Sequence, residues 1–305
     1  MKYAKINIGD MMEELKEEKV QKRKMRLWVK LIIFLFVLTI GTILYSRFIG
    51  TSGLLTKEYL IIDEELPNSF NGIKVAHITD IHYGQTVDKY DLRKIVKDVN
   101  EYKPDIIVIT GDLLDQDIVY SEEDIKDIIY YLKKLDASMG KYIIMGNHDN
   151  IKEEYIEIVA KSGLTNLNEN YETLYYKSNE PILIAGMSTG EYSNKTPQEK
   201  VNNAITEIKQ KEIKYSILIM HEPDYIDDIE YDNFDLVLAG HSHNGQVRLP
   251  FIGALVLPPH GQNYYDEYYQ LNNTDLYISS GIGTSRLKFR FLNKPSFNLY
   301  RIVNK

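Results

Sequence analysis

The sequence predicts an α/β protein with mixed strands, built from two packed β-sheets that are covered by helices. Three observations support this fold class. Apolar β-type runs alternate with helical patterns through most of the chain. Metal-binding side chains follow several of these runs directly, and one long apolar segment precedes them all. The 305 residues are 44% hydrophobic and 26% charged, which is typical of a folded body.

A charge-free run from Leu31 to Ser46, extended by apolar residues on both sides, predicts a transmembrane helix over residues 27–48. Lys30 and Arg47 lie at its ends, where long side chains reach the lipid headgroups. A cleaved signal peptide is the first alternative, and the 26-residue charged lead argues against it. A buried core helix is the second, and the lack of a polar face argues against that.

Residues 1–26 form a charged tail, in which pairs such as Glu18 and Lys22 predict a solvated helix beside the membrane. Basic residues gather on the N-terminal side of the apolar run. The positive-inside rule therefore places the tail in the cytoplasm. We expect a single-pass protein of the cell membrane, with a linker at 49–55 and an extracytoplasmic domain at 56–305.

The charge is divided unevenly along the chain. Residues 1–30 carry nine Lys or Arg and five Asp or Glu, a balance of +4, which leaves −12 for the rest. An acidic body repels polyanions, so polymeric nucleic acid is not expected as a partner. A small phosphorylated substrate remains compatible with a local positive site, and protein partners stay unknown.

The first half of the body is predicted to alternate strands with helices. Ser121 with Asp124 resembles a capping box, and Gly163 ends a helix. The expected strands are 73–79, 106–110 and 142–145, and the expected helices are 89–102, one starting near 121, and 153–162.

The second half is predicted to be richer in strands, with Gly and Pro between them. The single expected helix covers 197–211. The expected strands are 173–177, 182–187, 215–220, 236–239, 246–249, 276–279 and 297–302.

Five short motifs place polar side chains directly after predicted strands. Because ligands of α/β sheets sit at the carboxyl ends of the strands, one edge should gather these side chains. They are Asp80, His82, Asp112, Asn147, His148, His221, His241 and His243. The chain contains no cysteine, so any metal must be held by oxygen and imidazole nitrogen.

Carboxylates, an amide and imidazoles suit two divalent ions such as Mn²⁺, Zn²⁺ or Fe²⁺, with Mn²⁺ favoured. Two ions about 3.5–4 Å apart share a bridging carboxylate. Each motif alone has an ordinary structural explanation, such as a loop histidine or a helix cap. All five in this order favour a two-metal hydrolytic centre.

The motif set over residues 73–243 resembles that of the calcineurin-like metallophosphoesterases. The resemblance implies a four-layer αββα sandwich and a function as a metal-dependent phosphoric ester hydrolase. It assigns the first metal to Asp80, His82, Asp112 and His243. It assigns the second to Asp112, Asn147, His221 and His241.

The resemblance also implies catalytic roles for two further residues. His148 would contact the scissile phosphate and protonate the leaving oxygen, and Asp115 would orient the His148 imidazole. Gln116 stands where the phosphoprotein phosphatases of the family have arginine, which argues against phosphorylated proteins as substrates.

The C-terminal third resembles a bacterial membrane-associated branch of this family. That branch includes cell-wall phosphoesterases and enzymes similar to UDP-2,3-diacylglucosamine pyrophosphatase. We therefore expect hydrolysis of a phosphodiester, phosphomonoester or pyrophosphate in a membrane or envelope substrate, such as a lipid-linked nucleotide sugar. The alternatives are a non-catalytic metal-dependent binding module and a nucleotide or cyclic-nucleotide phosphodiesterase.

Four features outside this set carry separate expectations. His77 is predicted to be a core histidine and His260 to close a loop. The apolar run 249–257 is expected to be a buried hairpin, with a lipid-facing lip as the alternative. A basic cluster of Arg286, Lys288 and Arg290 is expected either on the solvated face of a strand or at a phosphate or headgroup.

Overall fold

The computed structural model describes residues 8–149, 153–190, 192–285 and 287–305. It divides into a helical unit that ends at Ser46 and a compact body that begins at Arg47. In the first unit, α1 (Ile8–Leu44) runs without a break from the charged tail through the apolar segment. A π-helical turn, Tyr45–Ile49, follows it.

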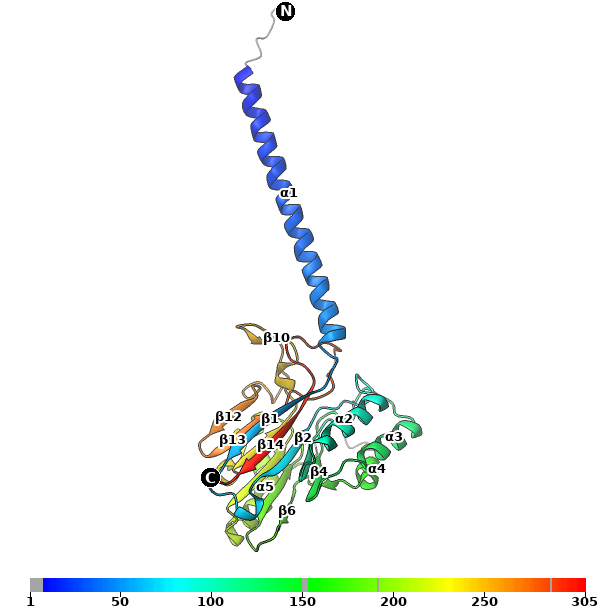
Figure 1. Cartoon of the computed structure of the whole chain (residues 1–305), viewed down its shortest axis with the longest axis vertical. Coiled ribbons are helices and arrows are strands. Elements are labelled where there is room, and N and C mark those ends of the chain that lie inside the picture. Colours follow the sequence, from blue (N-terminus) through cyan, green and yellow to red (C-terminus); the bar gives the residue numbers. More distant parts are fainter. Residues whose placement is uncertain (1–7, 150–152, 191, 286) are drawn as a thin grey trace, which may run out of the picture. The chain divides into compact units, whose positions relative to one another are not determined.

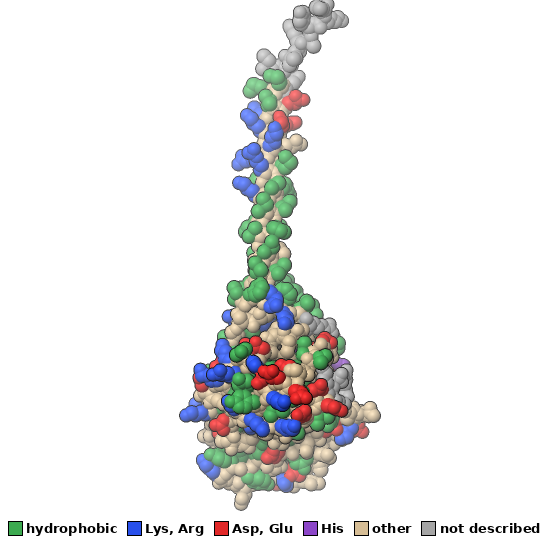
Figure 2. Space-filling view, turned by 90° about the vertical axis from the view of Figure 1, so that its right-hand side faces the viewer, with side chains coloured by type: hydrophobic (Ala, Val, Ile, Leu, Met, Phe, Trp, Pro, Cys, Tyr) green, Lys and Arg blue, Asp and Glu red, His purple; other side chains and the backbone are tan. Residues whose placement is uncertain are grey.

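The helix α1 has the length and apolar composition to cross a membrane, and its most apolar window is not buried in the body. This finding contradicts the alternative of a buried core helix. The predicted pair of Glu18 and Lys22 forms within the charged part of the helix. Figure 2 shows the charged side chains of this part giving way to a hydrophobic stretch.

The first sheet of the body has six strands and joins both ends of the body's sequence. Its spatial order places β14 between β1 and β2. All neighbours are parallel except β14 and β2. The strands, in spatial order, are β1 (Leu55–Ile62), β14 (Ser296–Val303), β2 (Ile73–Ile78), β3 (Ile106–Thr110), β4 (Gly140–Ile144) and β5 (Thr165–Asn166).

The second sheet also has six strands, with a parallel centre and an antiparallel strand at each edge. In spatial order they are β12 (Tyr268–Leu271), β13 (Thr274–Ile278), β9 (Leu236–Ala239), β8 (Tyr215–Met220), β7 (Ile182–Met187) and β6 (Asn170–Leu174). Both sheets are therefore mixed.

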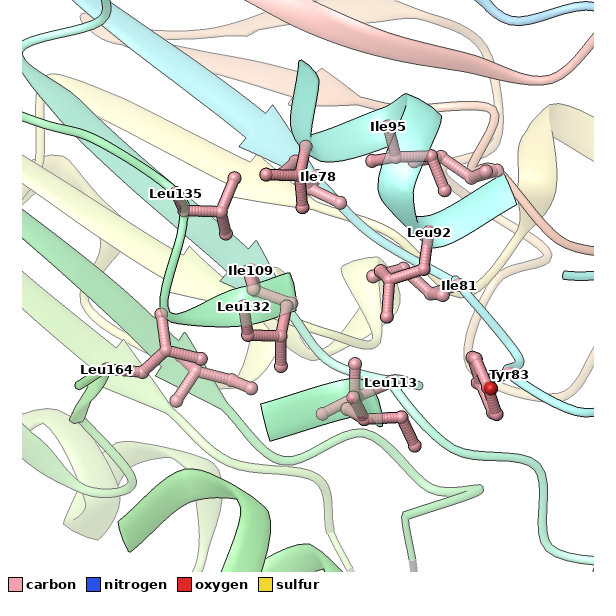
Figure 3. Close-up of a cluster of buried hydrophobic side chains, with 14 of the residues drawn as sticks. Ile78, Ile81, Tyr83, Leu92, Ile95, Ile109, Leu113, Leu132, Leu135 and Leu164 are labelled. Carbon is pink, nitrogen blue, oxygen red and sulfur yellow. The ribbon is translucent and has the colours of Figure 1, made fainter. Parts of the chain in front are cut away.

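Three apolar clusters show how the layers pack. One lies between the two sheets and includes Tyr142, Ile217 and Tyr300. A second joins the first sheet to α2 (Lys89–Glu101), α3 (Glu122–Leu132) and α4 (Glu153–Ser162), and Figure 3 shows part of it. The third packs α5 (Pro197–Lys211) on the second sheet. The order helix–sheet–sheet–helix is the predicted four-layer sandwich (Figure 1).

Local sequence signals account for the main elements. Asp88, Ser121 and Thr196 each accept a backbone N–H at a helix start, and each forms a capping box. Strand β1 was not among the predicted strands, and β6 begins three residues before the predicted one. Short 3₁₀ turns complete the body at Asn68–Phe70, Pro223–Asp228, Tyr231–Asn233 and His243–Gly245.

Two expectations outside the metal set were wrong. The run 249–257 does contain a hairpin, of β10 (Arg248–Leu249) and β11 (Gly253–Ala254), but most of its large apolar side chains are exposed. Arg290 is fully buried, so it does not lie on a solvated face. Arg286 of the same predicted cluster lies outside the described residues.

Two histidine predictions were confirmed. His77 is fully buried in β2, and one ring nitrogen lies 2.8 Å from the Thr110 hydroxyl. His260 is exposed in a loop, where its ring stacks on Tyr225 with 4.6 Å between the ring centres.

Burial of His77 should make stability depend on pH. Burial lowers the pKa of His77 to about 3, so the folded state keeps the imidazole neutral while the unfolded chain protonates below its usual pKa of 6.5. The free energy of unfolding should therefore decrease as the pH is lowered, by up to about 1.4 kcal/mol per pH unit from this residue alone. Urea unfolding between pH 7 and pH 5 should show a shallower slope for His77→Gln. The same change at exposed His260 is the matched control.

Candidate metal centre

All the predicted ligands lie at the carboxyl ends of strands in the middle of the two sheets. Residues 80–82 follow β2, residues 112–115 follow β3, and residues 147–148 follow β4. From the second sheet, His221 follows β8 and residues 241–243 follow β9. Because these strands are parallel within each sheet and the sheets pack face to face, the five loops converge at one edge.

One group of donors joins loops from both sheets. The Nε2 atoms of His82 and His243 lie 3.2 Å apart, and His243 Nε2 lies 3.5 Å from Asp80 Oδ1. His82 Nε2 is also 3.5 Å from Asp112 Oδ2. All three side chains of the group Asp80, His82 and His243 are buried. With Asp112, these residues are the set that the family resemblance implies for a first metal.

A second group lies around the other side of Asp112. His221 Nε2 is 3.3 Å from Asp112 Oδ2 and 3.0 Å from Asn147 Oδ1. His241 joins Asp112 and His221, with the three donor atoms within 4.8 Å of one another. Asp112 therefore contacts members of both groups, which is the position that a bridging carboxylate needs.

The hydrogen bonds behind the imidazoles fit a metal site. His221 Nδ1 lies 2.7 Å from the Thr110 carbonyl, and His241 Nε2 lies 2.7 Å from the Pro259 carbonyl. His82 Nδ1 faces Asp115 Oδ2 at 3.3 Å. The two carbonyls hold the proton on the outer nitrogens of His221 and His241 and leave their inner nitrogens free to bind a cation. The residues present thus suit two divalent ions.

The backbone around the ligands is strained. Five ligand-bearing residues adopt positive φ, a region that non-glycine residues visit at a cost of about 1–3 kcal/mol each. They are Asp80, His82, Asp112, His241 and His243. Gly240 and Gly111 permit close approach, because a Cβ at Gly240 would lie 2.7 Å from Asp80 Oδ2 and one at Gly111 2.6 Å from the Gly146 nitrogen.

The two buried carboxylates favour positive charge beside them, which the neighbouring imidazoles supply. Burial favours neutral Asp112, but the neighbouring imidazoles of His221 and His82 hold its pKa well below the usual range. Burial, together with the charge of Asp112, raises the pKa of Asp80. Burial opposes the charged form of His221, yet Asp112 raises its pKa to about 10. The pair of buried carboxylates therefore needs positive charge beside it.

His148 lies at the rim of the centre, almost buried. Its backbone N–H donates to Asp112 Oδ1 at 2.8 Å, and its Nδ1 is 3.6 Å from Asp115 Oδ2. Burial lowers the pKa of His148, but the carboxylates of Asp115 and Asp112 outweigh this and raise it. Asp115 thus faces two imidazoles, and it lies closer to His82 than to His148.

Two residues that were not predicted to belong to the site contact its loops and ligands. Asp149 accepts the backbone N–H groups of Leu114 and Gly146, both at 2.9 Å, and so ties the β3 and β4 loops together. Its place right after His148 was the available signal. Arg290 donates to the Ser280 carbonyl at 2.7 Å and lies 3.2 Å from His243 Nδ1. No local pattern could have indicated that contact.

Two buried groups of metal donors that share one carboxylate, on an αββα sandwich, define the class of dimetal phosphoesterases. Residues 73–245, more than half of the chain, match the family model described as calcineurin-like phosphoesterase. The chain belongs to this family, whose members use a dimetal centre, and it is a metal-dependent phosphoester hydrolase.

Three relatives illustrate the range of the family. The Bacillus subtilis protein named uncharacterized metallophosphoesterase YkuE is 31% identical over 85% of this chain and 88% of its own length. A Danio rerio transmembrane protein with metallophosphoesterase domain is 26% identical over 76% of this chain, which spans only 53% of that relative. The Chlamydia trachomatis UDP-2,3-diacylglucosamine pyrophosphatase LpxG is 22% identical over 78% of this chain and 87% of its own.

Proposed function

We propose that the chain is a membrane-anchored dimetal phosphoesterase that hydrolyses a phosphodiester, phosphomonoester or pyrophosphate bond in an envelope-associated, lipid-linked substrate. The observation that carries the proposal is the position of Asp112 between two groups of buried donors. The apolar helix α1 and the chemistry named for the relative LpxG support a substrate at the membrane. Mn²⁺ is the favoured ion, with Zn²⁺ and Fe²⁺ as the other candidates.

The proposed roles of the residues are metal binding, proton donation and orientation of the imidazoles. Asp80, His82, Asp112 and His243 would hold one ion, and Asp112, Asn147, His221 and His241 the other. When bound, two such ions polarise the phosphoryl oxygens and lower the pKa of an attacking water. His148, at the rim, would donate a proton to the departing oxygen. Asp115 would keep the imidazoles of His148 and His82 oriented.

Hydrolysis tests separate this proposal from its alternatives. The full chain in nanodiscs, loaded with Mn²⁺, should hydrolyse bis-p-nitrophenyl phosphate, and chelation should remove the activity. Lipid-linked esters and pyrophosphates should be turned over faster than cyclic nucleotides. Metal binding without turnover of any ester would favour a binding module. Preference for cyclic nucleotides would favour the nucleotide phosphodiesterase.

The proposed topology places the N-terminus in the cytoplasm and the body outside, because Lys22, Arg23 and Lys24 precede the apolar run. Because the chain has no cysteine, single thiols report their location without background. On intact cells, a membrane-impermeant maleimide should label Lys305→Cys but should label Lys16→Cys only after lysis. Labelling of Lys16→Cys on intact cells would reverse the orientation.

A further inference from the structure

The hairpin of β10 and β11 exposes large apolar side chains instead of burying them. Phe251 is fully exposed at its turn, and Ile252, Leu255 and Val256 are also exposed. Exposed apolar side chains that are contiguous mark interaction sites in soluble bodies, whereas scattered ones do not. The hairpin is therefore the first sign of an interaction surface.

A neighbouring loop extends this surface. The Arg248 N–H donates to the Phe291 carbonyl at 3.0 Å, and the Phe291 N–H donates back to Gln246 at 3.2 Å. The same loop exposes Leu287 and Leu292. We call these exposed side chains the apolar lip: Phe251, Ile252, Leu255, Val256, Leu287 and Leu292.

The lip continues toward the segment in which the chain leaves its apolar helix. Arg47, Thr51 and Lys288 line one surface depression, together with residues 83–88 and Asp124. Phe48 and Ile49 beside Arg47 are exposed as well. Arg47 directly follows the charge-free run, so a bilayer spanned by that run would have its headgroups at this part of the body.

The segments that flank the lip also contact the loops of the candidate metal centre. The hairpin lies between His243 and Pro259, and the Pro259 carbonyl accepts from the ring of His241 at 2.7 Å. A Cβ at Gly245 would lie only 2.1 Å from Ala254 Cβ, so the hairpin base packs closely on the loop that carries His243. Whatever binds the lip is therefore held at the rim of the site.

We propose that the apolar lip inserts into the bilayer leaflet next to Arg47 and holds the rim of the metal centre at headgroup level. The anchor holds the lip beside this leaflet, so the effective concentration of lipid at the lip is high. A soluble partner would have to compete with that lipid for the same surface. Phe and aliphatic side chains flanked by Arg47 and Lys288 suit the boundary between acyl chains and phosphate headgroups. The function of the lip, presenting a lipid-borne ester to the site, rests on the proposed function.

The absence of cysteine allows a direct test of insertion in the full chain. An environment-sensitive NBD probe at Phe251→Cys, in nanodiscs of phosphatidylcholine and phosphatidylglycerol, should be quenched several-fold more by doxyl-labelled lipid than one at Tyr175→Cys. Tyr175 is the matched control. It is exposed and directly follows β6, which runs antiparallel to β7 and therefore ends at the amino ends of the parallel strands, away from the candidate metal centre. Equal quenching at the two positions overturns the proposal.

A second copy of the chain is the competing occupant of the lip. It would make the NBD emission depend on the number of chains per nanodisc and not on the doxyl lipid. That result would also overturn insertion. Independence from protein density, combined with strong quenching, supports the bilayer as the occupant.

Activity measurements separate the lip from the proposed function. Ile252→Asp should lower turnover of phosphatidyl-p-nitrophenol in nanodiscs relative to turnover of soluble bis-p-nitrophenyl phosphate, several-fold in the ratio. Tyr175→Asp should keep the wild-type ratio, and an unchanged ratio in Ile252→Asp would contradict presentation by the lip. If the wild type cleaves neither ester while Phe251→Cys is quenched, the proposed function fails and the membrane surface stands.

Discussion

Replacement of Asp112 by asparagine is expected to abolish hydrolysis of bis-p-nitrophenyl phosphate, by a factor of about a thousand or more, because several kcal/mol of transition-state stabilisation are lost with the ions. The structure gives the physical reason. Asp112 Oδ2 lies 3.5 Å from His82 Nε2 and 3.3 Å from His221 Nε2, so one atom serves both donor groups. An amide in its place removes the charge, and its NH₂ group cannot ligate a cation.

The measurement is kcat/KM together with metal content per chain. The amide oxygen of Asp112→Asn can still accept the His148 N–H, so the fold should persist while metal content falls. Asp136→Asn is the matched control, since Asp136 is exposed and precedes β4 at the opposite edge of the first sheet. Wild-type activity in Asp112→Asn would refute the two-metal mechanism.

His148→Ala should have the second largest effect, a fall in kcat of about 10²–10⁴ for an ester with a poor leaving group. His148 is outside the proposed ligand set, so metal content should stay at the wild-type level. An alkyl ester, whose leaving oxygen needs a proton, should suffer more than a p-nitrophenyl ester, whose leaving group is already a stable anion. His260→Ala should leave both rates unchanged.

The comparison of leaving groups is the decisive part of that experiment. If His148→Ala slowed both esters equally, then His148 would bind the phosphate without donating a proton. If it also lowered metal content, the residue would belong to the metal set, as its place near His82 and Asp112 makes geometrically feasible.

The convergence of the candidate ligands could be predicted because its signals are local. Each ligand directly follows a strand that an apolar run identifies, such as Ile106–Thr110 before Asp112. The carboxyl ends of parallel strands then have to meet at one edge. Local signals also identified helices, such as the one that begins with the capping box at Ser121, which is read from four consecutive residues.

The features that escaped prediction depend on distant partners. Strand β1 contains Lys57 and Glu58 and pairs only along one side, so its sequence lacks the apolar run of a central strand. Arg290 looked like a surface base because the carbonyls that bury it belong to residues 280, 281 and 283. The hairpin at 249–257 looked like core because hydrophobicity alone does not tell a buried surface from one meant for a partner.

The position of β14 has a consequence for how this protein is made. The last strand, Ser296–Val303, fills the gap between β1 and β2, two strands from the beginning of the body. The first sheet therefore cannot close until residues 296–303 have been synthesised. An export machinery that threads unfolded polypeptide would receive a body whose first sheet still lacks β14, and the sheet could be completed only after residues 296–303 had crossed.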